Sequence, residues 1–90
     1  MLTVAEALAA PAGSTVTVRG YVIATAGATL LCEMLAESYP PQPGGAQLPV
    51  EGLDVTALGG TESAGDTVWT DDQRVVAGVV AGGVLRVPAH

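Results

Sequence analysis

The sequence contains no lysine and only three arginines, which face nine carboxylates and give the 90-residue chain a formal net charge of -6. Proteins that bind nucleic acids neutralise phosphates with clustered lysines and arginines. Arg19, Arg74 and Arg86 are instead scattered along the chain. The composition therefore argues against nucleic acid as a partner and, for the same reason, against an anionic membrane surface. The negative charge favours solubility and would steer a basic partner.

The side chains that most often act in catalysis are almost absent as well, because the chain has one histidine and one cysteine. Nucleophilic catalysis needs a base and an orienting group beside the nucleophile, and His90 is the terminal residue, where order is least expected. Cys32 stands in an apolar segment, in which a small buried side chain is its expected role. It permits no disulfide within the chain and fits a reducing compartment. We therefore predict that the protein is not an enzyme and has no catalytic residues.

Metal and phosphate sites also lack their usual patterns. Neither Asp71-Asp72 nor Glu33 with Glu37 supplies the spaced oxygen ligands of a cation site. Gly44-Gly45 opens onto a predicted strand, whereas a phosphate-binding loop opens onto a helix. We expect neither a metal nor a cofactor.

No membrane signal is present. No apolar run approaches the ~20 residues of a transmembrane helix, and the chain begins with no cationic leader. If Met1 is the native start, these patterns predict a cytoplasmic protein with no membrane partner. The length predicts one domain over residues 1–90.

What the chain does contain is a β-rich pattern built from small apolar residues. Valine, alanine and leucine supply most of the apolar volume, and phenylalanine is absent, which favours a narrow barrel. The clearest strand spans residues 15–24, where alternate valines mark one face. Gly20 interrupts it, and a glycine in mid-strand marks a sharp bend or the close approach of another backbone. We predict a long first strand that bends to serve both sides of a barrel.

The other predicted elements come from caps, turns and apolar runs. Thr3 and Glu6 have the spacing of a capping box, which predicts a short helix that Pro11 ends. Residues 29–35 favour a second strand, with a helical segment as the alternative. Gly82-Gly83 between two valine-rich runs predicts a closing hairpin. The remaining expectations, in chain order, are a Pro-rich loop over residues 36–45, a short third strand over 47–53, a helical turn over 55–58 capped by Asp54, and a loop over 61–67.

This order of elements gives the fold class. Five strands with a helical turn between the third and fourth predict a mainly β, OB-like Greek-key barrel with a short N-terminal helix. A second set of residues carries a resemblance to known proteins: Val4 to Leu8, Gly13, Val16, Val18, Gly20 to Val22, Leu31 to Glu33, Glu37 to Pro41, Gly44, Gly45, Leu48, Gly52, Leu53, Trp69 and Val76 to Val79. With these residues the sequence resembles a family of small uncharacterised bacterial OB-fold proteins of the stand-alone, tRNA anti-codon-like kind. The resemblance implies a second cysteine at the position of Pro43, so it gives Cys32 no partner here.

The least ordinary segment is the Pro-rich loop, which places an aromatic ring and a carboxylate on a stiff backbone. Stiff segments lose little entropy on binding, so we predict a binding site there, with Trp69 as a second aromatic. The alternatives are that the loop only caps one barrel end and that Trp69 packs in the core. The predicted binding residues are Glu37, Ser38, Tyr39, Pro40, Pro41 and Trp69.

Three functions are compatible with this pattern. The leading hypothesis is a non-catalytic protein-interaction or binding module, with self-association through exposed strand edges as one form of it. The alternative is a small-ligand or peptide pocket at the barrel mouth, lined by Tyr39 and Trp69. A weaker alternative is an acidic mimic of nucleic acid, which requires five carboxylates on one face: Glu33, Glu37, Asp54, Asp71 and Asp72.

Overall fold

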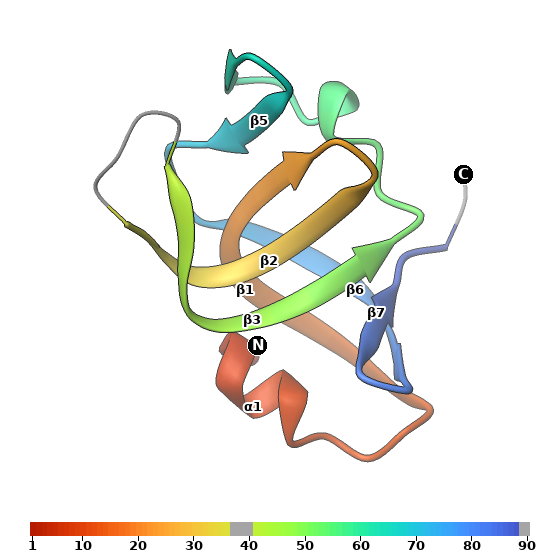
Figure 1. Cartoon of the computed structure of the whole chain (residues 1–90). Coiled ribbons are helices and arrows are strands. Elements are labelled where there is room, and N and C mark those ends of the chain that lie inside the picture. The colour runs from red at the N-terminus through yellow and green to blue at the C-terminus, as the bar shows by residue number, and fades with distance from the viewer. Residues whose placement is uncertain (37–40, 89–90) are drawn as a thin grey trace.

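A long bent strand, β1 (Ser14–Thr25), organises the fold. The computed structural model describes residues 1–36 and 41–88 of the chain (Figure 1). The first half of β1 pairs antiparallel with β6 (Arg74–Ala81), and the second half pairs with β2 (Ala28–Ala36). The change of partner falls at Gly20, which confirms the predicted bend.

Two further strands close the sheet into a ring. β3 (Gln42–Glu51) pairs with β2, and β7 (Val84–Arg86) joins β3 to β6. The five strands run in the order β1–β2–β3–β7–β6 and return to β1, and every pair is antiparallel except β3 with β7. A closed five-stranded barrel with this parallel pair has OB topology, as the sequence predicted.

The N-terminal helix starts as its sequence predicted. In α1 (Val4–Leu8), the Glu6 N–H donates to the Thr3 hydroxyl over 3.1 Å. The Thr3 N–H in turn donates to the Glu6 carboxylate over 2.8 Å. Both halves of the capping box are therefore formed.

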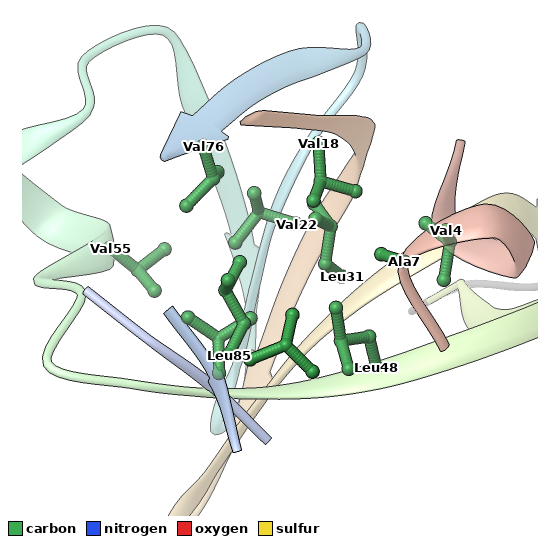
Figure 2. Close-up of a cluster of buried hydrophobic side chains, with 11 residues drawn as sticks. Val4, Ala7, Val18, Val22, Leu31, Leu48, Val55, Val76 and Leu85 are labelled. Carbon is green, nitrogen blue, oxygen red and sulfur yellow. The ribbon is translucent and has the colours of Figure 1, made fainter. Parts of the chain in front are cut away.

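Short helical elements cover the two ends of the barrel, with α1 below and η1 (Val55–Ala57) above in Figure 1. Val4 and Ala7 of α1 enter the hydrophobic core from one end, and Val55 of η1 enters it from the other, as Figure 2 shows. The predicted helical turn between the third and fourth barrel strands is therefore present, as a 3-10 turn.

The closing hairpin and the second strand agree with the prediction. Gly82 and Gly83 connect β6 to β7, and both have positive φ, at 61° and 76°. These are the backbone conformations of a tight two-residue hairpin turn. Residues 29–35, for which a helix was the alternative, lie within strand β2.

Two predicted loops contain strand. β3 begins at Gln42, inside the expected loop over residues 36–45, because β2 provides partners for it: Pro43 lies opposite Leu35 and Gly44 opposite Met34. Residues 61–67 contain β4 (Thr61–Ala64) and the start of β5 (Thr67–Thr70), a hairpin that extends the sheet along the second half of β1. Tertiary pairing has overridden weak local preference in both segments.

Candidate functional site

An apolar groove of about 390 Å³ lies along β6, on the side of the barrel where the C-terminal segment leaves β7. Its floor comes from β6, one wall from the segment that contains η1, and the other from the residues that follow β7. The apolar side chains that define these walls are Leu53, Leu58, Val75, Val79, Val87 and Pro88.

The sequence of β6 explains why the floor is apolar. Val76 and Val80 point into the core and are 5% and 4% exposed, whereas the alternate residues face outward. Val75 on that outer face is 51% exposed, and the outward positions after it are also apolar. Strands that are apolar on both faces are normally covered on both faces. The outer face of β6 is therefore chemically suited to contact with another apolar surface.

One edge of β6 is also open. β7 pairs with β6 only through Val79, Val80 and Ala81, so residues 74–78 of β6 pair with β1 alone in the described part of the chain. Continuing the β6–β7 register would place Pro88 opposite Ala77. Proline has no N–H to donate to that position.

The chain leaves the β6–β7 ladder at Val87, one residue before Pro88. The Val87 N–H donates to the Glu51 carbonyl over 2.8 Å, which draws the C-terminal segment toward β3 and away from β6. The backbone groups on this edge of β6 consequently face the groove.

The wall of the groove that contains η1 is held in place by Arg74, the first residue of β6. Its guanidinium donates to the Leu58 carbonyl over 3.3 Å and to the Gly59 carbonyl over 3.0 Å, and it contacts Asp72 at 2.8 Å. Through that hydrogen bond, Arg74 holds the pKa of Asp72 below its usual value. Arg74 thereby ties the η1 segment to β6.

Asp54 shapes the same wall. Its carboxylate accepts from the Thr56 N–H over 3.1 Å and from the Thr56 hydroxyl over 2.6 Å, as an N-cap does. This cap starts η1, so that Leu53 and Leu58 on either side of the turn both reach the groove.

Carboxylates outnumber cations around the groove. Three carboxylates lie next to residues that line it: Asp54 follows Leu53, Asp72 is paired with Arg74 just before Val75, and the Glu51 carbonyl accepts from the Val87 N–H. Arg74 is paired with Asp72, and Arg86 lies 3.8 Å from Glu51 with both side chains largely exposed. The rim therefore carries a small negative excess, in keeping with the net charge of -6.

The predicted binding residues do not line this groove. Glu37, Ser38, Tyr39 and Pro40 lie outside the described residues, so the predicted role of the Pro-rich loop stays a prediction. Pro41 is buried.

Trp69 is buried too. Its side chain is 3% exposed and belongs to a small core cluster with Ile23 and Cys32. The indole N–H donates to the Asp71 carboxylate over 3.2 Å. This is the core packing considered as the alternative for Trp69, and its role in binding remains a prediction.

Cys32 has the environment of an unreactive thiol. It is fully buried, and its sulfur donates to the Tyr21 carbonyl at 3.4 Å. Burial raises the pKa of the Cys32 thiol, which lowers the fraction of thiolate at neutral pH.

Two other hollows, of about 200 and 330 Å³, flank the start of α1 and share Thr3 and Arg19. Glu33 and Gln73 complete the larger one. The charges of Arg19 and Glu33 offset each other there, and the lining is mixed in character. Of these three hollows, the groove along β6 is the one lined mainly by apolar residues, with Thr15 of β1 as the polar exception.

Among the described residues, no three histidine, cysteine or acidic side chains come together as metal ligands would. The same residues contain no helix with the length and apolarity needed to cross a bilayer. The chain matches no family model, no curated protein and no solved structure. The resemblance to a bacterial OB-fold family therefore remains a prediction.

The sequence did contain a signal for the groove. The segment Arg74–Ala81 has no polar residue after its arginine, whereas the outer face of β1 carries Thr15, Thr17 and Arg19. Two apolar faces on one strand of a small protein indicate a second contact surface.

Proposed function

We propose that this protein is a non-catalytic binding module that holds an apolar segment of a partner in the groove along β6. The observation that carries the proposal is the outward apolar face of β6, with Val75 half exposed between the walls formed by Leu58 and Val87. A concave apolar surface with a few polar groups at its margin is typical of binding sites.

The other two functions have less support. A pocket at the barrel mouth lined by Tyr39 and Trp69 would have to form around a tryptophan that is 3% exposed. An acidic mimic needs its carboxylates on one face, but Glu33 lies beside the start of α1, whereas Asp54 caps η1 at the opposite end of the barrel (Figure 1).

The test is a screen of small apolar compounds by ¹⁵N–¹H correlation NMR. We expect compounds that bind to shift the amides of residues 75–79 and of Leu58. Val75→Thr keeps the size and strand preference of the side chain but adds a hydroxyl, and we expect it to weaken binding by about threefold to tenfold.

Met34→Thr is the matched control, because Met34 is 54% exposed on β2 and lies outside the groove. It should leave binding unchanged. Shifts that cluster elsewhere, or equal effects of the two substitutions, would remove the support for the groove as the binding site.

A further inference from the structure

We infer that the partner enters the groove as an added β-strand, an extended cationic segment of another protein that pairs with the open edge of β6. This inference rests on the proposed function and goes further, because it specifies the conformation and the charge of the partner.

The first step is the direction of the backbone groups on β6. A two-residue hairpin turn makes its flanking residues, Ala81 and Val84, a hydrogen-bonded pair. Alternation along β6 then directs the N–H and C=O of Val79, Ala77 and Val75 toward the β7 side. The backbone groups of the alternate residues, Val76, Gly78 and Val80, point the other way, toward β1. The Gly13 N–H, just before β1, donates to the Val80 carbonyl over 2.6 Å, in agreement with this direction.

The second step is what those groups meet. Val79 and Ala81 pair with β7, but the described part of the chain places no strand opposite Ala77 or Val75 on that side. Their backbone groups therefore offer two N–H donors and two carbonyl acceptors beside an apolar groove. An extended peptide satisfies such an edge with main-chain hydrogen bonds and places alternate side chains in the groove.

The third step is charge. The chain carries -6 overall, and three carboxylates, Glu51, Asp54 and Asp72, lie with Arg74 and Arg86 next to residues that line the groove. A segment with lysine or arginine beside its apolar residues is attracted to this rim. A second copy of the chain would bring another -6, so we infer a cationic partner rather than self-association.

The experiment selects a displayed library of random short peptides against the whole protein. We expect enrichment of lysine or arginine flanking β-branched residues, and binding that weakens as salt is raised. In NMR, the Val75 and Ala77 amides should become protected from hydrogen exchange when a selected peptide is bound.

Ala77→Pro isolates the strand pairing. It removes the N–H that faces the groove but no bond to β1, and prolines are tolerated at such edge positions. Ala77→Val is its control, since it adds comparable bulk and keeps the N–H. We expect the proline variant to bind selected peptides roughly tenfold more weakly than the valine variant, while small apolar compounds bind both alike.

A second measurement does not depend on the folding of a variant. Peptides methylated on alternate backbone nitrogens should lose affinity for the wild-type protein in one of the two methylation patterns only. Equal binding of both patterns, no peptide selected, enrichment of acidic peptides, or a dimer formed through β6 would each overturn the inference. If small apolar compounds still bind the groove in those cases, the proposed function stands without the added strand.

Discussion

Gly20 lies where β1 passes from β6 to β2, and the absence of a side chain allows three parts of the molecule to meet there. A Cβ at this position would be 2.8 Å from the Cys32 carbonyl oxygen, 3.0 Å from Val4 and 3.1 Å from Leu31. The carbonyl belongs to strand β2, and the other two side chains are fully buried, so none of the three has room to move.

We therefore predict that Gly20→Ala lowers the free energy of unfolding by about 1 to 3 kcal/mol, the usual cost of overpacking a core. Urea denaturation measures it. Gly44→Ala is the control, because the nearest atom to its added Cβ belongs to Met34, a half-exposed flexible side chain that can turn aside. A loss for Gly20→Ala no greater than for Gly44→Ala would mean that the bend tolerates a side chain.

Features of single residues could be predicted from the sequence where the interacting residues lie close together in the chain. The capping box of Thr3 and Glu6 and the Gly82-Gly83 turn involve residues close in sequence, and both were predicted. Pro43 and Gly44 have the local character of a loop, and only their partners on β2 make them strand. Long-range pairing of this kind is not encoded in local preference.

At the scale of elements, Arg74 supplies the side-chain hydrogen bonds that tie the η1 segment to β6, while Val55 anchors the segment in the core. The hydrogen bonds of Arg74 to the Leu58 and Gly59 carbonyls are the described side-chain bonds between this segment and β6. We predict that Arg74→Ala costs about 1 to 2 kcal/mol of unfolding free energy and speeds hydrogen exchange of the Leu58 amide, which otherwise donates to Val55.

Arg86→Ala serves as the comparison, because that arginine is 67% exposed and its contact with Glu51 is 3.8 Å long. Exposed pairs of this kind contribute little. The lowered pKa of Asp72 adds a pH test. The pair with Arg74 contributes stability above the ordinary aspartate pKa and loses it as the pH falls through the folded-state pKa, so the stability difference between wild type and Arg74→Ala should narrow in acid to the part that the carbonyl hydrogen bonds contribute. Equal hydrogen exchange of the Leu58 amide in Arg74→Ala and Arg86→Ala would show that Arg74 does not hold the η1 segment.

The candidate site illustrates what sequence could predict for an element. A strand was predicted over residues 73–81, where the structure has Arg74–Ala81, and the two apolar faces of this run are visible in the sequence. Which face stays uncovered depends on where β7 stops and where the η1 segment folds back, which are properties of the closed barrel. The binding site was predicted in the Pro-rich loop instead, because the composition of that loop is unusual.

For the whole molecule, closure of the barrel depends on its shortest ladder. Among the described residues, β3 and β7 pair only through Val50 with Leu85 and Glu51 with Arg86, whereas β1 pairs with β6 along residues 14–20. Parallel pairs are also slightly less stable per residue. Opening of a native protein starts where local stability is lowest, so the barrel should open between β3 and β7 while β7 stays attached to β6.

Neighbouring amides on β7 test this order of opening. The hairpin register directs the Arg86 N–H toward β6 and the Leu85 N–H toward β3. We predict that the Leu85 amide, although fully buried, exchanges faster than the Arg86 amide once both rates are corrected for their intrinsic values. Simple fraying of the C-terminal end would give the reverse order.

Because Val87 and Pro88 form a wall of the groove, a bound partner should slow exchange at Leu85 and leave the Ala7 amide of α1 unchanged. Faster exchange at Arg86 would show fraying from the C-terminal end instead of opening between β3 and β7, and a partner that protects Leu85 and Ala7 equally would show that the barrel opens as a single unit.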